Sequence, residues 1–291
     1  AAQTTTTYYN LFGWGQNNYG QLGLGNTTNY SSPKQVGGNT ESWGSISGGS
    51  AHSAAIKTDG TLWMWGRNNV GQLGLGNLTN YSSPKQVGAL TTWSTVALGQ
   101  FMSYVVKTDG TLWAWGYNAD GQLGLGNTTY YSSPKQVGSL TNWSSQVAGG
   151  RFHVVAIKTD GTMWSWGRGS PYGSLGQGNT LNYSSPKQIG ALTTWSKVAS
   201  IWWSVAAIKT DGTLWTWGKN GSGELGSGTT TNRSSPVQVG ALTNWLNISG
   251  AGYVFYAIKT DGTLWAWGDN SLGTLGLNNV TSYSSPNKLV L

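Results

Sequence analysis

The feature that most constrains this chain is a repeated unit of roughly 50 residues, which recurs along its whole length. Each copy carries a Trp-Gly pair and a Ser-Ser-Pro triplet, and five copies carry the string Lys-Thr-Asp-Gly. The Trp-Gly pairs begin at Trp14, Trp65, Trp115, Trp166, Trp217 and Trp267. No linker interrupts this register, so we predict one domain over residues 1–291 that is built from six repeats.

Each repeat reads as four short β-strands separated by turns. In one copy we expect these strands at residues 85–87, 93–97, 103–107 and 111–115. Pro84 suits the start of the first strand, where its missing N–H removes no bond from the sheet. Asp109-Gly110 predicts a tight hairpin between the third and fourth strands, because glycine accepts a positive φ.

The fourth strand of each repeat has a large face and a small face. Trp113 and Trp115 are two residues apart and so point the same way, whereas Ala114 points to the opposite side. The residues equivalent to Ala114 are Gly13, Met64, Ser165, Thr216 and Ala266. Most of these are small, and sheets with one large and one small face interdigitate when they stack.

Four-stranded sheets of this kind, arranged radially, form a β-propeller. We therefore predict an all-β protein, a β-propeller of six four-stranded blades. A solenoid is the alternative way to stack the repeats, but neither end carries a polar capping repeat. Strand-like segments at residues 3–7 and 11–14 begin the chain and another at residues 287–291 ends it. We expect the N- and C-termini to share the last blade, which lacks one strand on this count.

The composition supports a large core and excludes several classes of protein. The chain has 18 Trp and 14 Tyr residues, and each buried aromatic side chain hides roughly 150–250 Å² of surface. The absence of cysteine excludes disulfides, thiolate metal sites and a cysteine nucleophile. No apolar run reaches the roughly 18 residues of a membrane span, and no signal peptide is visible. We expect no membrane insertion.

The net charge of +7 does not by itself indicate nucleic acid as a partner. Five lysines belong to the Lys-Thr-Asp-Gly strings and four follow Ser-Ser-Pro, so they are spread over the repeats. A nucleic-acid-binding protein is expected to concentrate its cations on one stripe. We therefore do not expect a nucleic-acid partner.

Patterns for catalysis and metal binding are absent from the sequence. Five of the nine acidic residues are the hairpin aspartates, and their role in the turn accounts for them. There is no carboxylate pair, histidine cluster or nucleophile elbow. The glycine-rich segment 218–223 lacks the spacing of a phosphate-binding loop. We predict that the chain is not an enzyme and that it binds no cofactor or metal.

The strings K-T-D-G-T-L-W-A-W-G at residues 107–116 and G-Q-L-G-L-G-N at residues 121–127 have cognates in the other periods. On these motifs, which cover essentially the whole chain, the sequence resembles the regulator of chromosome condensation repeat family. The resemblance implies a β-propeller, often seven-bladed in that family, and the six periods here depart from that number. It also implies relatives such as a chromatin-bound exchange factor for a small GTPase, secreted inhibitors of β-lactamase, and bacterial and phage proteins. The near-identical Thr/Asn/Ser/Tyr-rich repeats are most similar to the last group.

Two loops differ between the copies, whereas the rest of each repeat is nearly constant. One loop joins the second and third strands, and the other is the long connection after the fourth strand. Both lie at the same end of an antiparallel sheet, and binding residues are found more often on loops than on the scaffold. We predict a partner-binding face there. Its candidate residues are Tyr19, His52, Phe101, Arg151, Phe152, His153, Tyr172, Trp202, Trp203 and Tyr253.

Other interpretations of these residues stay open. His52 and His153 occupy a position at which the family often has histidine, and a packed, hydrogen-bonded role is expected there. The aromatic side chains of the loop between the second and third strands could fill the central channel of the propeller instead of binding a partner.

For function we predict a non-catalytic structural or adhesive protein of a phage virion or tail, or of a bacterial surface. The expected location is extracellular or on the virion surface. The expected partner is a protein or a cell-surface glycan, and other virion proteins are included among the proteins. The alternatives are a lectin-like carbohydrate binder and a propeller that binds or inhibits a single protein.

Overall fold

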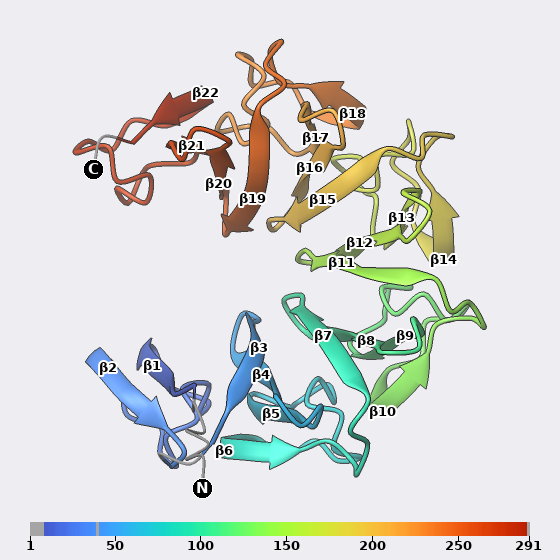
Figure 1. The fold of residues 1–291 in the computed structure, drawn as a ribbon, viewed down its shortest axis with the longest axis vertical. Helices are drawn as coiled ribbons and strands as arrows, with labels where there is room; N and C mark the ends of the chain where they lie inside the picture. The colour runs from blue at the N-terminus through green and yellow to red at the C-terminus, as the bar shows by residue number, and fades with distance from the viewer. Residues whose placement is uncertain (1–8, 39–40, 290–291) are drawn as a thin grey trace, which may run out of the picture. The chain divides into compact units, whose positions relative to one another are not determined.

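The computed structural model describes residues 9–38 and 41–289, and the regular structure in these ranges is β-strand throughout. Strands β1 to β22 form five four-stranded sheets and one two-stranded sheet (Figure 1). This confirms the prediction of an all-β chain with the six sheets of a six-bladed β-propeller. The described residues include no helix that is long and apolar enough to cross a membrane.

The chain divides into two compact units, which we describe separately. The first unit comprises residues 1–117 and 130–141, and the second comprises residues 118–129 and 142–291. Three sheets belong to the first unit. Their strands are β1 (Leu11–Gly15) and β2 (Tyr30–Val36); β3 (Trp43–Gly48), β4 (His52–Lys57), β5 (Leu62–Gly66) and β6 (Tyr81–Gln86); β7 (Trp93–Leu98), β8 (Met102–Lys107), β9 (Leu112–Gly116) and β10 (Tyr131–Gln136).

The second unit contains three sheets, each of four antiparallel strands in chain order. Their strands are β11 (Trp143–Gly149), β12 (His153–Lys158), β13 (Met163–Gly167) and β14 (Tyr183–Gln188); β15 (Trp195–Ser200), β16 (Ser204–Lys209), β17 (Leu214–Gly218) and β18 (Arg233–Gln238); β19 (Trp245–Ala251), β20 (Val254–Lys259), β21 (Leu264–Gly268) and β22 (Tyr283–Lys288). The second and third strands of each sheet are joined by the predicted Asp-Gly hairpin.

The hairpin between β8 and β9 shows why this turn is copied. Gly110 has a φ of 76°, a conformation that costs glycine little. The Asp109 carboxylate accepts hydrogen bonds from the backbone N–H of Thr111 at 3.0 Å and from its hydroxyl at 2.6 Å. The Thr111 hydroxyl oxygen in turn accepts the Nε1–H of Trp113 at 3.0 Å. One short string therefore sets both the turn and the orientation of the first tryptophan in the following strand.

The strand that contains Ser-Ser-Pro differs from the expectation in two ways. It begins before the proline, so that Pro84 lies inside β6 rather than at its start. It also pairs with β5 and so completes the sheet of the preceding repeat, whereas we expected it to begin a new sheet. Because β6 is the edge strand of its sheet, a proline is tolerated within it.

The same pairing corrects the prediction that the two termini share the last blade. β22 completes the sheet of β19, β20 and β21, while β1 pairs with β2 in a separate sheet. The reason is the antiparallel register of β21 and β22, in which Trp265 lies opposite Lys288 and Gly268 lies opposite Tyr283. The strand expected at residues 3–7 lies outside the described residues, as do residues 290–291 of the one expected at the C-terminus.

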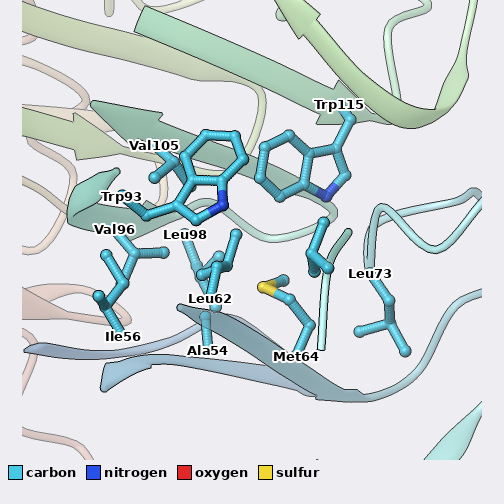
Figure 2. Packing of buried hydrophobic residues seen from close by; sticks show 11 residues of the cluster. Ala54, Ile56, Leu62, Met64, Leu73, Trp93, Val96, Leu98, Val105 and Trp115 are labelled. Atoms are coloured by element: carbon cyan, nitrogen blue, oxygen red, sulfur yellow. The ribbon is translucent and has the colours of Figure 1, made fainter. Parts of the chain in front are cut away.

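Side chains of neighbouring sheets in the first unit interdigitate, as predicted from strands with one large and one small face (Figure 2). Ala54 and Met64, from the sheet of β3 to β6, are buried in one cluster with Trp93 and Trp115 from the sheet of β7 to β10. Trp115 also donates its Nε1–H to the carbonyl of Gln72 at 2.9 Å. This bond attaches the third strand of one sheet to the long loop of the preceding sheet, and Trp217 and Trp267 make equivalent bonds in the second unit.

Candidate functional site

The variable loop, which joins the first and second strands of an observed sheet, meets the residue that follows the Trp-Gly pair. In the second unit, Arg168 donates its backbone N–H to the carbonyl of Phe152 at 2.8 Å, and Lys219 donates to that of Trp203 at 3.1 Å. Equivalent bonds join Asp269 to Tyr253 and, in the first unit, Arg67 to Ala51 and Tyr117 to Phe101. The repeated backbone therefore places two variable positions next to each other in each of these sheets.

Backbone hydrogen bonds also join the variable loops of neighbouring sheets in the second unit. The N–H of Arg151 donates to the carbonyl of Trp202 at 3.0 Å. The N–H of Trp202 donates to the carbonyl of Gly252, also at 3.0 Å. These bonds hold the loops of three consecutive sheets side by side.

Aromatic rings from these loops pack on one another. The ring centroid of Trp203 lies 5.5 Å from that of Phe152 and 5.5 Å from that of Tyr172. The ring centroids of Trp202 and Tyr253 are 4.9 Å apart. All five side chains are partly exposed. The rings are thus held by contact with one another and still reach the surface.

Two arginines lie against these rings. The Cζ of Arg151 is 4.9 Å from the ring centroid of Trp202, 5.3 Å from that of Phe152 and 5.5 Å from that of Trp203. The Cζ of Arg168 is 5.7 Å from the centroid of Phe152 and 5.8 Å from that of Trp203. All of these distances are within the range of cation–π attraction, so Phe152 and Trp203 each interact with both guanidinium groups.

Lys219 also lies against a ring of these loops, and it is paired with a buried carboxylate. Its Nζ is 4.3 Å from the ring centroid of Tyr253 and 3.2 Å from Oε1 of Glu224, a residue that is fully buried. Oε2 of Glu224 accepts the backbone N–H of Ser222 at 2.7 Å. We refer to the whole group as the arginine–aromatic cluster, which consists of Arg151, Phe152, Arg168, Tyr172, Trp202, Trp203, Lys219 and Tyr253.

The first unit has a smaller set of the same kind. The Cζ of Arg67 is 4.8 Å from the ring centroid of Tyr19 and 5.6 Å from that of Phe101. The ring of Phe101 is 6.2 Å from that of Tyr117, which is 4.9 Å from that of Tyr130. The predicted site residues Tyr19 and Phe101 therefore belong to this set, linked by an arginine that the sequence analysis did not name.

His52 and His153 are buried at the starts of β4 and β12. The Nε2 of His153 lies 2.8 Å from the hydroxyl oxygen of Ser200, and that of His52 lies 3.4 Å from the hydroxyl oxygen of Ser103. Burial lowers the pKa of His153 to about 3. Burial also lowers the pKa of His52 to about 4, although a backbone hydrogen bond with Met102 raises it in part. Both side chains are packed and neutral at pH 7, and they are not part of the exposed surface.

The position that follows each Trp-Gly pair was not among the predicted site residues. This position holds Gln16, Arg67, Tyr117, Arg168, Lys219 and Asp269. A usable signal was present, because the residue type changes there while the preceding Trp-Gly pair stays constant. The pairing of the second and third strands of each sheet brings this position to the variable loop.

The arginine–aromatic cluster offers the chemistry of recognition. It presents guanidinium donors and the faces of several aromatic rings, which are the groups that contribute most to the centres of protein interfaces. In the part of the chain that the structure describes, no three His, Cys, Asp or Glu residues are grouped so as to hold a metal ion. The geometry therefore indicates a binding surface.

Comparison with known proteins gives a family and a fold. The model of the regulator of chromosome condensation (RCC1) repeat matches residues 10–56, 59–106, 109–157, 160–208 and 211–258. The ultraviolet-B receptor UVR8 of Arabidopsis thaliana is 30% identical over 219 residues, which are 73% of this chain and 38% of the receptor. The chain thus spans less than half the length of this curated relative.

Two solved structures resemble this one over nearly all of its length. Human WBSCR16 has a TM-score of 0.85 at 22% identity, and the match covers 96% of this chain and 76% of that one. Yeast RCC1 (Prp20), solved bound to Kap60, has a TM-score of 0.82 at 21% identity, over 96% of this chain and 71% of that one. At these identities the likeness establishes the fold.

Proposed function

Because the chain belongs to the regulator of chromosome condensation (RCC1) repeat family, we propose that it is a non-catalytic module that binds a protein partner. The contacts centre on the arginine–aromatic cluster of the second unit. Six of the site residues predicted from the variable loops lie in this cluster: Arg151, Phe152, Tyr172, Trp202, Trp203 and Tyr253.

The observation that carries the proposal is the packing of partly exposed aromatic rings against two arginines. Tryptophan, tyrosine and arginine are the residues that most often dominate the energy of a protein interface. Phe152, Trp202 and Trp203 are also held in place before binding, by ring contacts and by the backbone bonds of their loops. A preorganised side chain loses less conformational entropy when a partner arrives, which favours affinity.

The similar proteins are consistent with a protein partner. Yeast RCC1, which contains this fold, was solved as a complex with the protein Kap60. Because the identity to that structure is only 21%, the identity of the partner does not transfer. The partner of this chain is therefore proposed as a class.

The setting that we propose is a phage virion or tail, or a bacterial surface, with the protein located outside the cell or on the particle. The support is compositional: nearly interchangeable repeats rich in Thr, Asn, Ser and Tyr, with few charged residues. A cell-surface glycan is the second candidate partner. It is favoured by the partly exposed rings of Trp202 and Tyr253, on which a sugar ring could stack.

The test is the double variant Phe152→Ala/Trp202→Ala, which removes a ring that contacts both arginines and the ring nearest to Arg151. Proteins retained by the immobilised wild type are identified by mass spectrometry, purified, and titrated by calorimetry against each variant. We expect at least a tenfold loss of affinity, equivalent to about 1.4 kcal/mol.

The matched control is Tyr183→Ala, which removes a partly buried ring on the outer strand β14 without touching the cluster. It should bind the purified partner as the wild type does. Equal affinity of the folded double variant and the control would contradict the proposal. Retention of glycans alone, lost in the double variant, would replace the protein partner by the second candidate.

A further inference from the structure

We propose that the arginine–aromatic cluster recognises carboxylate groups, and that the partner contacts it through an acidic segment of polypeptide. This inference rests on the proposed function and adds to it the chemistry of the partner. It is carried by four features of the second unit: two arginines on shared rings, a desolvated guanidinium edge, a lysine paired with a carboxylate and two flanking aspartates.

The first feature is the closeness of two positive charges. Arg151 and Arg168 both lie within cation–π distance of Phe152 and of Trp203. Cation–π contact with these rings fixes the positions of the guanidinium groups. Guanidinium groups donate in their own plane, in a geometry that matches the two oxygens of a carboxylate. A carboxylate that approaches either guanidinium group would gain a charge-assisted hydrogen bond from it.

The second feature is the partial desolvation of the Arg168 guanidinium group. Its Nε–H is buried and has no hydrogen-bond acceptor among the described residues. Arg168 as a residue is only partly buried, so part of its side chain reaches the surface. A charged donor that is desolvated on one edge is stabilised more by a nearby anion than a fully hydrated one would be.

The third and fourth features decide the kind of anion. Lys219 is already paired with the buried carboxylate of Glu224, so we expect the anion to meet the guanidinium groups of the cluster and not this ammonium group. Asp120 accepts a hydrogen bond from Asn182, whose Oδ1 accepts the N–H of Gly169, so this carboxylate lies beside the Arg168 loop.

The second aspartate, Asp269, follows the third Trp-Gly pair of the unit. The pKa of its carboxyl is lowered mainly by hydrogen bonding with the Ser271 backbone, and the nearby charge of Lys219 contributes to the lowering. A continuous polyanion such as a nucleic acid would meet these two aspartates. A peptide with separated carboxylates can place them on the arginines alone. The flanking charges therefore favour the acidic peptide over a nucleic acid.

The experiment measures binding of a labelled ten-residue peptide of alternating glutamate and glycine, with its glutamine–glycine counterpart as the neutral probe. We expect the wild type to bind the glutamate peptide and not the glutamine peptide. The variant Arg151→Gln/Arg168→Gln should bind the glutamate peptide about tenfold more weakly or worse, since loss of a charge-assisted hydrogen bond has effects of that size.

The matched control is Arg233→Gln, because Arg233 is an exposed arginine on the outer strand β18. It should bind the glutamate peptide within about twofold of the wild type, as expected for a surface charge outside the contact. The variant Arg151→Lys/Arg168→Lys keeps the charge but loses the planar donors, and it should bind with intermediate affinity.

Equal binding of the two peptides to the wild type, or equal affinity of Arg151→Gln/Arg168→Gln and Arg233→Gln, would overturn the acidic-partner proposal. Tighter binding of a single-stranded oligonucleotide, lost in the same variant, would overturn it in favour of a nucleic acid. If the double variant does not fold, the wild type still tests the idea. Its affinity for the glutamate peptide must fall as salt rises from about 0.05 to about 0.5 M, and constant affinity would refute it. None of these outcomes changes the result for Phe152→Ala/Trp202→Ala, on which the proposed function stands or falls separately.

Discussion

At the scale of single residues, burial separates the two histidines from the residues around them. His52 is 1% exposed and His153 is fully buried, while Phe152, next to His153 in the chain, reaches the surface. The Nδ1 atoms of both histidines are buried without a hydrogen-bond partner among the described residues. A protonated imidazole would need an acceptor at each nitrogen, so these sites favour the neutral ring.

The first prediction at this scale concerns stability between pH 7 and pH 5. The folded pKa values of about 4 for His52 and about 3 for His153 lie below the ordinary value of 6.5. The unfolded chain therefore binds more protons than the folded protein in this window, and the free energy of unfolding falls as pH falls below about 6.5. Urea unfolding at pH 7 and pH 5 should show this loss. In the variant His52→Gln/His153→Gln the difference between the two pH values should shrink markedly. An unchanged difference would mean that other groups cause it.

At the scale of elements, the long loop of one sheet packs around the indole of a tryptophan from the next sheet. In the first unit Trp115 enters the loop that follows β5, and its Nε1–H is accepted by the Gln72 carbonyl. Gly74, in the same loop, has a φ of 71°, and a Cβ built on it would lie 2.7 Å from Nε1 of Trp115. The loop therefore requires glycine at this position for two reasons, its backbone conformation and the close approach of the indole.

Two substitutions in the first unit separate these reasons. Gly88 has a φ of 61°, and nothing lies within 4 Å of a Cβ built on it, so Gly88→Ala should cost only the conformational penalty of about 1–2 kcal/mol. Gly74→Ala should lose this amount and about 1–3 kcal/mol more, because the added methyl overlaps the indole. Chemical denaturation of both variants measures the difference. Equal losses for the two would show that the loop can shift away from the tryptophan.

At the scale of the whole molecule, one hairpin is used five times. Asp59, Asp109, Asp160, Asp211 and Asp261 each hydrogen-bond to the threonine two residues later. Chiefly for this reason the pKa of each carboxyl is held below its ordinary value. These aspartates are exposed, so a single copy contributes little, but the contributions have the same sign and add up.

The resulting prediction is a loss of stability in acid. Below about pH 4 the unfolded chain takes up protons that the folded hairpins resist, so the free energy of unfolding falls as pH decreases through the folded pKa values. The variant Asp160→Asn/Asp211→Asn removes two of the five groups and should show a shallower decline between pH 4 and pH 2.5. Its pH dependence between pH 5 and pH 7 serves as the control and should match that of the wild type. A decline as steep as that of the wild type would contradict the summed effect.

The local features of this protein could be predicted from the amino-acid sequence alone. Strand alternation around Trp113 and Trp115, the Asp-Gly turn and the two variable loops all follow from residues near one another in the chain. The family followed from the same strings, because its motif lies within a single repeat. The variable loops also indicated most members of the arginine–aromatic cluster, although not Arg168 or Lys219.

Only the tertiary structure decided which strand pairs with which and which side chains meet. The repeats are so alike that nothing local shows whether the Ser-Ser-Pro strand belongs to the preceding sheet or the next, and hydrogen bonds to β5 decide it for β6. The meeting of Arg151 with Trp202, and of Arg168 with Trp203, joins residues roughly 35 to 50 positions apart on neighbouring sheets. Such contacts depend on how neighbouring sheets pack against each other. The amino-acid sequence of a single repeat does not indicate this packing.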